Sequence, residues 1–564
     1  MYMKHFVTIL LFCFIANAVN AQDKLPTLLE HYQADKGSLE RFYVIEASPE
    51  RRERFIKFYK DYLNTLRQFQ FNSLSQSDKV DYLLFKNQLE AAIQEGNNET
   101  ATYESIKEWV NFGFPLYEQE KARRRGATID AQKTAMQWDQ INKKLINTTK
   151  QFQQLSALPK ASSRAIANTI KGYQHALQSI QGFYKGYDPT YDWWTAVIYK
   201  QLDSNLKLYN TMLANKPDVL GSQKQDASGI IGYPIGSESL QQLLKTAYIP
   251  YSAEELIKIA EKEFAWCDAE MLKASREMGY GDNWKAALEN VKNSYVPIGQ
   301  QPAMIMDLYN QSIDFIKKND MITIPPLAEE TWRMIMMTPQ QQLVSPFFLG
   351  GETLMISYPT SDMPEDVKLM SMRGNNPHFS RATVHHELIA GHHLEGFMND
   401  RYKSYRNFDT PFWTEGWSLY WEFLLWDKGF PRNAEDRVGM LFWRMHRCAR
   451  IIFSLNYHLK KWTPQECIDF LVDRVGHERA NAEGEVRRSF TGGYGPLYQL
   501  AYMVGALQLR ALKEELVDTG KMSLKQFNDA VMHENNMPIE MLRALLKKEP
   551  LMEDYKTQWR FYKF

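Results

Sequence analysis

Apolar side chains recur at intervals of three and four residues along most of the chain, which is the spacing of amphipathic α-helices. This spacing runs from about 24 to 210, where Arg52–Leu63 is a clear example, and it returns from Ser252. Ser252 and Glu255 have the spacing of a capping box, which marks the start of a helix. From Ala382 to the end the pattern is again mostly helical. The hydrophobic pattern therefore predicts a mainly α protein.

Two stretches interrupt this pattern. Residues Gln342–Tyr358 are the one convincing strand region, with Gly350-Gly351 as the expected turn of a hairpin. Residues 215–240 are rich in Gly, Pro and Ser, which is typical of a loop or a domain boundary. We therefore expect two lobes, an N-terminal helical region over 22–230 and a C-terminal region over 231–564, with a small β-sheet in the second.

The first residues have the pattern of a signal peptide. A short basic start precedes the apolar run Phe6–Ala16, and Val19 and Ala21 place small residues before a cleavage point. The run is shorter than the ~20 residues that a membrane span needs. We expect residues 1–21 to be removed. The mature protein, from about Gln22, is then exported to the periplasm or the medium without membrane insertion.

The composition narrows the classes of partner. The chain has 67 Lys and Arg against 67 Asp and Glu, a formal net charge of +0, which argues against nucleic acid or an anionic membrane as a partner. Aromatic residues make up 13%, which fits either a stacking cleft or a large helical core. The four cysteines form no CxxC pair, so a cysteine-based zinc site has no support.

Histidines are concentrated in one place. Of 12 histidines, five fall within sixteen residues: His378, His385, His386, His392 and His393. Imidazole is a common metal ligand, and the embedded His386-Glu387 pair places a carboxylate directly beside one imidazole. The cluster predicts a metal site.

The spacing of the histidines differs from the familiar HExxH arrangement, because position 390 is Ala. On a straight helix His392 lies ~9 Å along the axis from His386, and His393 lies ~10.5 Å along it. Neither pair could then bind one zinc ion at ~2.1 Å. We therefore expect the helix to break at Ala390-Gly391, so that His392 or His393 returns to the site.

These residues carry a resemblance to a known family. The segment His386–Leu394 resembles the HExxPGHHLQ motif of the bacterial family called domain of unknown function 885, which is grouped with gluzincin-like zinc metallopeptidases. Glu415–Glu422 is similar to its EGWALYxE motif, and Glu485–Gly505 to its EVxRY…PGQALAYxxG block. The resemblance spans most of 22–564 and implies a two-lobed helical metallopeptidase-like fold, with the sheet beside the active-site helix.

The sequence also departs from the family pattern at three places. Ala390 stands where the family has Pro, and Pro496-Leu497-Tyr498 stands where it has PGQ. Ser454-Leu455-Asn456 replaces its DTG. The proposed metal-binding residues are intact, whereas the residues expected to face the substrate are altered.

The chemistry of a catalytic zinc site assigns the roles. Zn²⁺ takes three protein ligands and keeps one position open. We expect His386 and His392 to be two of them, and the resemblance implies Glu415 as the third. Glu387 is the expected general base for water whose pKa zinc lowers. Glu422, seven residues after Glu415, either hydrogen-bonds a ligand or is a solvated helix carboxylate.

An oxyanion formed during hydrolysis needs a hydrogen-bond donor near the metal. Tyr502, His458 and Arg488 are the candidates, because each lies in a segment that matches the family.

The sequence therefore predicts a secreted zinc-dependent hydrolase that acts on a peptide or small amide, most simply a metallopeptidase. Two alternatives stay open: a metal-dependent amidohydrolase for a non-peptide amide, and a catalytically silent binding protein of the same fold. The intact Glu387 favours an enzyme over a binding protein, because binding alone needs no base beside the metal. The mode of cleavage and the oligomeric state remain open.

Overall fold

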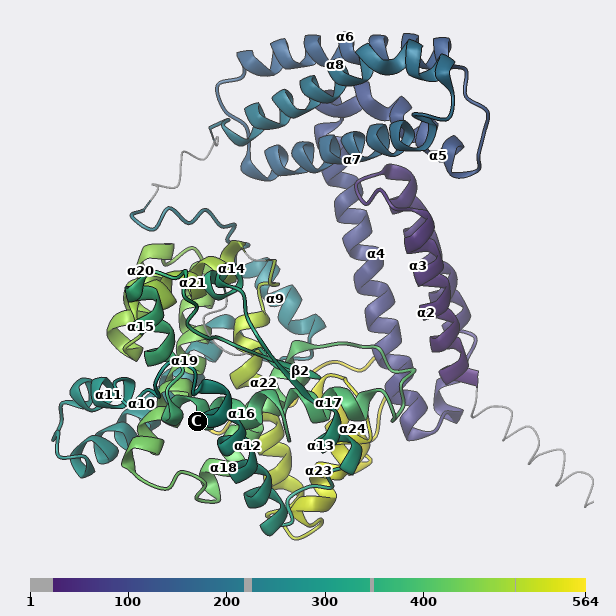
Figure 1. The fold of residues 1–564 in the computed structure, drawn as a ribbon. Coiled ribbons are helices and arrows are strands. Elements are labelled where there is room, and N and C mark those ends of the chain that lie inside the picture. The colour runs from purple at the N-terminus through teal and green to yellow at the C-terminus, as the bar shows by residue number, and fades with distance from the viewer. Residues whose placement is uncertain (1–23, 218–225, 345–348, 492) are drawn as a thin grey trace, which may run out of the picture. The chain divides into compact units, whose positions relative to one another are not determined.

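The computed structural model describes residues 24–217, 226–344, 349–491 and 493–564. The predicted signal peptide lies outside these ranges. The described chain is mainly α-helical with one small two-stranded sheet, as the hydrophobic pattern predicts (Figure 1). The capping box is present: Ser252 Oγ accepts from the Glu255 amide at 3.2 Å, and a Glu255 carboxylate oxygen accepts from the Ser252 amide at 2.8 Å.

The chain forms two compact units. The first contains the residues up to Ser73 together with Phe85–Lys224, and the second contains Leu74–Leu84 together with Gln225–Phe564. One helix, α4, begins in the second unit and continues into the first.

The first unit is a bundle around an apolar core. Trp138, Tyr173 and Tyr209 are buried in that core, where α6, α7 and α8 pack against one another. Packing against one another removes the apolar stripe of each long helix from water. Its helices are α2 (Lys24–Phe42), α3 (Pro49–Leu66), α4 (Gln76–Val110), α5 (Phe114–Arg124), α6 (Ala131–Gln154), α7 (Lys160–Tyr184) and α8 (Pro189–Ala214).

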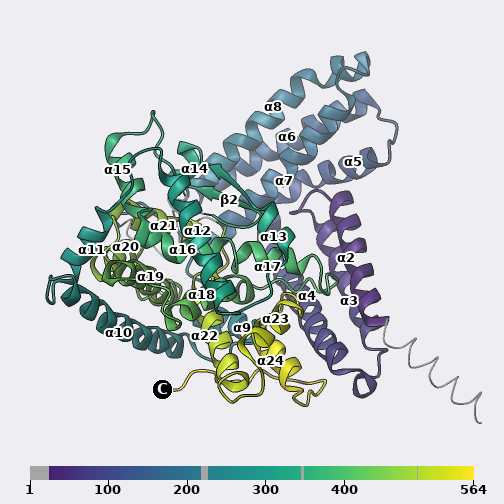
Figure 2. The same cartoon turned by 60° about the horizontal axis from the view of Figure 1, so that its bottom comes forward.

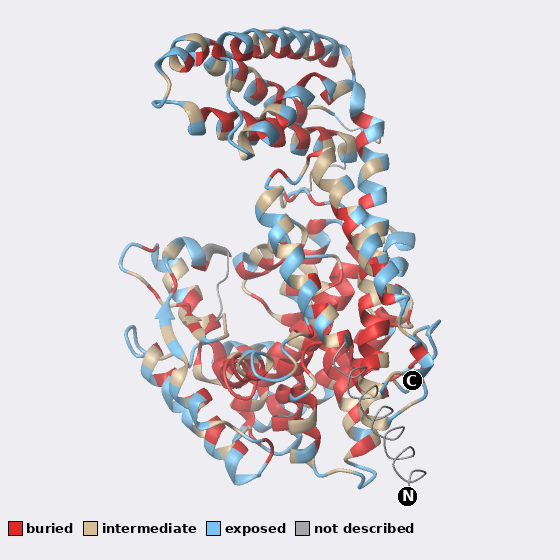
Figure 3. Ribbon diagram, turned by 90° about the vertical axis from the view of Figure 1, so that its right-hand side faces the viewer, coloured by how far each residue is buried: buried red, intermediate tan, exposed pale blue. Residues whose placement is uncertain are grey.

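The second unit is built around four helices that pack on one another: α16, α18, α19 and α22 (Figure 2). Almost every residue of α18 and α19 is buried, so these helices form the interior of the unit. Figure 3 shows how buried and exposed residues are distributed over the helices. The helices of this unit after α4 are α9 (Ser237–Thr246), α10 (Ala253–Glu277), α11 (Trp284–Lys292), α12 (Gln301–Lys318), α13 (Pro326–Thr331), α14 (Pro339–Val344), α15 (Glu365–Gly374), α16 (Pro377–Glu387), α17 (His392–Asn399), α18 (Pro411–Asp427), α19 (Ala434–His458), α20 (Pro464–Phe470), α21 (Arg479–Thr491), α22 (Tyr498–Leu516), α23 (Leu524–Met532) and α24 (Ile539–Lys547).

The small sheet differs from the expected hairpin. Strand β2 (Thr353–Ile356) pairs in parallel with β1 (Arg333–Met336), with Arg333 opposite Thr353. Leu349 and Met355 do exchange backbone hydrogen bonds across Gly350-Gly351, so the turn is present, but it closes a single antiparallel bridge. The start of the expected strand region belongs to α14, which Pro339 begins. A four-residue strand is too short to show a clear alternation, and the sequence analysis missed β1 for that reason.

None of the helices that the structure describes combines the length and the apolar character that a membrane crossing requires.

Candidate metal centre

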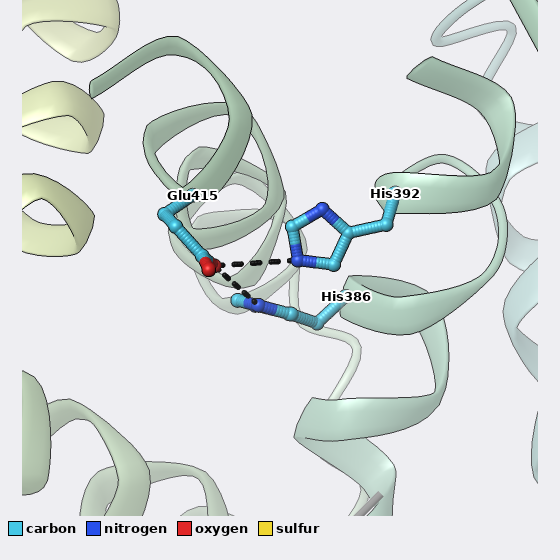
Figure 4. A group of neighbouring side chains, drawn as sticks. All are labelled: His386, His392 and Glu415. Carbon is cyan, nitrogen blue, oxygen red and sulfur yellow. Dashed lines mark ion pairs between the residues drawn. The ribbon is translucent and has the colours of Figure 1, made fainter. Parts of the chain in front are cut away.

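Three side chains from three helices meet in the second unit (Figure 4). His386 lies in the last turn of α16, His392 begins α17, and Glu415 lies in the first turns of α18. Glu415 Oε2 is 3.3 Å from Nε2 of His392 and 3.7 Å from Nε2 of His386. One ligand atom from each residue lies within 4.8 Å of the others. The structure therefore brings together the three residues that the sequence analysis assigned as ligands.

A break between α16 and α17 makes this meeting possible, which confirms the expected interruption at Ala390-Gly391. A Cβ atom on Gly391 would lie 1.8 Å from the carbonyl oxygen of His386, so only glycine fits there. The indole Nε1 of Trp417 donates to the carbonyl oxygen of Ala390 at 2.7 Å and holds the connecting segment. Because Trp417 and Glu415 both belong to α18, one helix positions the break and supplies a candidate ligand.

The other histidines of the cluster have partners elsewhere. His393 contacts the backbone oxygen of Ala328 through Nε2 at 2.7 Å, so it faces away from the three residues that meet. His378 Nδ1 lies 2.8 Å from Asp436. His385 is fully buried, and burial lowers its pKa to about 4. Of the two alternatives for the second imidazole, the structure places His392 in the site.

Neighbouring side chains orient His386 and Glu415 through hydrogen bonds. Glu422 Oε1 lies 2.7 Å from Nδ1 of His386, which leaves Nε2 of that ring to face the site. Glu422 is only 4% exposed, so it is not a solvated helix carboxylate. The hydroxyl of Tyr498 donates to Oε1 of Glu415, which leaves Oε2 directed at the two imidazoles. Such partners of metal-binding side chains fix tautomer and ring orientation.

Glu387 lies beside the cluster and lines the same cavity. Burial raises its pKa, and the neighbouring Glu415 carboxylate raises it as well, against the lowering effect of the two imidazoles. The charges of His392 and His386, which outweigh the effect of burial, hold the pKa of Glu415 well below its usual range. The pKa values of two carboxylates in one cavity are thus shifted in opposite directions, which keeps Glu415 ionised, as a metal ligand must be.

The cavity has a volume of about 510 Å³, the size of a small-molecule site. Tyr502 and Arg488, both expected as oxyanion donors, line it. His458 does not: its ring packs beside Tyr457 and Phe490, and burial lowers its pKa to about 4. His458 lies in a segment that resembles the family, but that resemblance does not indicate in which direction its side chain points.

Several residues that line the cavity were not predicted from the sequence, among them Tyr498, Arg447 and Arg450. Tyr498 lies one turn before Tyr502 on α22, and this spacing of four residues could have suggested a shared face. Arg447 and Arg450 lie three residues apart on α19. Buried arginines cannot be distinguished from solvated ones by residue type alone.

The donor set fits a zinc ion. Bonds of about 2.0–2.1 Å to tetrahedral zinc separate neighbouring ligand atoms by roughly 3.4 Å. The 3.3 and 3.7 Å separations of Glu415 Oε2 from the two imidazoles agree with this value. Among the described residues Oε2 is buried and accepts no hydrogen bond, and its nearest charged neighbours are the two imidazoles. Two imidazoles and one carboxylate are also a donor set of catalytic zinc.

The fold and the site define a class: a mainly helical protein with a buried two-histidine, one-glutamate centre beside a second glutamate. The chain belongs to the DUF885 family of bacterial proteins of unknown function, which it matches over residues 43–546. No curated protein matches it.

Among the solved structures that share the fold are two bacterial proteins. One is described as "a putative lipoprotein of unknown function" from Shewanella oneidensis, with 15% identity, a TM-score of 0.67, and coverage of 93% of this chain and 100% of that chain. The other is described as "the putative lipoprotein" from Colwellia psychrerythraea, with 15% identity, a TM-score of 0.60, and coverage of 94% and 99%. At this identity the likeness concerns the fold alone.

Proposed function

We propose that the protein is a zinc-dependent hydrolase of amide bonds, and that its substrates are peptides. The observation that carries the proposal is the position of Glu387 beside His386, His392 and Glu415 at one cavity. Two imidazoles and a carboxylate hold a metal, and a further carboxylate that is not among them is what hydrolysis needs as a base.

When bound, zinc supplies a Lewis acid that polarises the substrate carbonyl and acidifies a water molecule. Glu387 would accept a proton from a water molecule in the cavity, and the hydroxide so formed would add to the acyl carbon. The C–N bond then breaks, and Glu387 passes the proton to the departing amine.

Other residues of the chain hold and stabilise the reacting groups. Glu422 fixes the ring of His386, and Tyr498 fixes the carboxylate of Glu415. Burial raises the pKa of Tyr502 to about 12, so its hydroxyl stays protonated at neutral pH and can donate to a developing oxyanion. Arg488 lines the same cavity.

We also infer that the protein acts outside the cytoplasm. The signal-peptide pattern of residues 1–21 supports this, and so do the descriptions of the two structural relatives as lipoproteins. Periplasm and medium are both consistent with these observations.

A peptide library tests the proposal. The mature protein, loaded with zinc, is incubated with peptides of mixed sequence, and new termini are identified by mass spectrometry. We expect cleavage that the Glu387→Gln variant loses by at least a hundredfold, because the amide has the same shape but cannot accept the proton. Zinc content and unfolding temperature of the variant should equal those of the wild type. Folded, zinc-loaded protein that cleaves no peptide would overturn the proposal, and cleavage of non-peptide amides alone would favour an amidohydrolase.

A further inference from the structure

Three arginines gather at one part of the cavity. Arg447 and Arg450 come from α19, and Arg488 comes from α21. The exposed fractions of their side chains are 6%, 4% and 13%. Guanidinium groups stay charged at all relevant pH values, and burial of such groups is stable only with negative partners.

The protein itself supplies too few negative partners for these three groups. Glu485 serves two of them, with oxygens 2.7 Å from Nε of Arg450 and 2.9 Å from Nε of Arg488. The carboxylate nearest to Arg447 is that of Glu422, at 3.6 Å, and it already holds His386. Three guanidinium charges therefore share two carboxylates.

Of the four other carboxylates that line the cavity, Glu387 is the proposed base and the remaining three have partners of their own. Glu395 accepts from Thr414 at 3.1 Å, and Asp409 accepts from Asn536 at 3.4 Å. Glu415 accepts from Tyr498 and faces the imidazoles.

Some N–H groups of these arginines also lack a hydrogen-bond acceptor among the described residues. Within the described residues, Nη1 of Arg450 and Nε of Arg447 are buried and have no hydrogen-bond partner. A buried donor without an acceptor destabilises the folded protein. An anionic ligand in the cavity would remove this destabilisation and balance the charge.

Two of the arginines lie near the candidate metal centre, because both contact Tyr502. The ring centroid of Tyr502 is 4.5 Å from Cζ of both Arg447 and Arg450, and 6.3 Å from the ring centroid of His386. The Tyr502 ring is thus a neighbour of two of the guanidinium groups and of the His386 imidazole. In a peptide, the C-terminal carboxylate carbon is under about 4 Å from the carbonyl carbon of the preceding residue, and one more residue adds about 3.8 Å.

We propose that Arg447, Arg450 and Arg488 form a subsite for the free C-terminal carboxylate of the substrate, so that the enzyme removes one or two residues from the carboxyl ends of peptides. Arginine suits this role because its planar group can donate two parallel hydrogen bonds to a carboxylate. The inference rests on the peptide hydrolase function proposed above and adds the mode of cleavage to it.

The cleavage test uses two peptides that differ only at the C-terminus, one a free acid and the other an amide. We expect the zinc-loaded protein to cleave the acid with a kcat/KM at least a hundredfold higher. Arg488→Gln should raise KM for the acid at least tenfold and reduce the discrimination between the two peptides. Arg487→Gln changes the exposed neighbour on the same helix and should leave both values unchanged. Equal cleavage of acid and amide would overturn the subsite.

A binding test separates this inference from the proposed function. An N-acetylated dipeptide and its C-terminal amide are titrated calorimetrically into the zinc-loaded Glu387→Gln variant, which needs no turnover. We expect the acid to bind at least tenfold more tightly, and the added Arg488→Gln change to reduce the difference. Carboxylate preference without cleavage by the wild type would refute the hydrolase and keep the subsite. Equal binding of acid and amide would refute the subsite whatever the activity.

Discussion

Replacement of Glu422 tests whether a side chain that does not itself bind the metal strengthens zinc binding by orienting His386. Its Oε1 lies 2.7 Å from Nδ1 of His386, and the side chain is 4% exposed, so water cannot take its place. Loss of such a partner typically weakens metal binding by about 10- to 100-fold, which corresponds to about 1.4–2.7 kcal/mol. Gln keeps an acceptor oxygen and loses only the charge. We therefore expect about tenfold weaker zinc binding for Glu422→Gln and about 100-fold for Glu422→Leu.

The assay is competition for zinc with a chromophoric chelator at neutral pH. Glu514→Gln is the matched control, because Glu514 is an exposed helix carboxylate of the same unit. Unfolding temperatures show that each variant is folded. A Glu422→Leu protein that is folded and binds zinc within twofold of the wild type would refute the reasoning.

Three further predictions concern stability. Gly391→Ala places Cβ 1.8 Å from the His386 carbonyl oxygen, so the connecting segment must move, and we expect lost zinc binding together with a lower unfolding temperature. Arg406→Leu leaves the buried Asp81 carboxylate, 2.6 Å from Arg406 Nε, without its partner, which should cost about 3–5 kcal/mol in urea unfolding; an added Asp81→Asn change should recover much of it. His458 has a pKa of about 4 in the folded protein against about 6.5 unfolded, so the unfolded chain gains its proton first. Stability should then fall by up to about 3 kcal/mol as the pH drops from 6.5 to 4, and His458→Gln should flatten this dependence; an unchanged slope would contradict the assignment.

Local rules predicted much of the architecture and part of the site. Helical periodicity identified the helices because an apolar stripe must be buried wherever it lies. Helix geometry also predicted the break at Ala390-Gly391, since no straight helix brings His386 and His392 to one ion. The spacing of seven residues between Glu415 and Glu422 placed both on one face of a helix, as the structure has them.

The remaining features depend on contacts between distant segments. The parallel pairing of β1 and β2 joins strands separated by a helix, and no local pattern specifies such a partner. The approach of α22 to α18 is also non-local: a Cβ on Gly505 would lie 2.0 Å from the carbonyl oxygen of Phe412. This approach brings Tyr498 to Glu415. Neither the approach of the two helices nor this contact can be predicted from the sequence.

Zinc content after dialysis against a chelating resin tests the central claim most directly. We expect about one zinc per chain in the wild type and in His393→Ala, because His393 contacts the backbone of Ala328 outside the centre. His386→Ala, His392→Ala and Glu415→Ala should each retain less than about a tenth of that amount. Zinc lost from folded His393→Ala but kept by His392→Ala would contradict the assigned ligands, and a folded wild type that binds no zinc would contradict the metal centre itself.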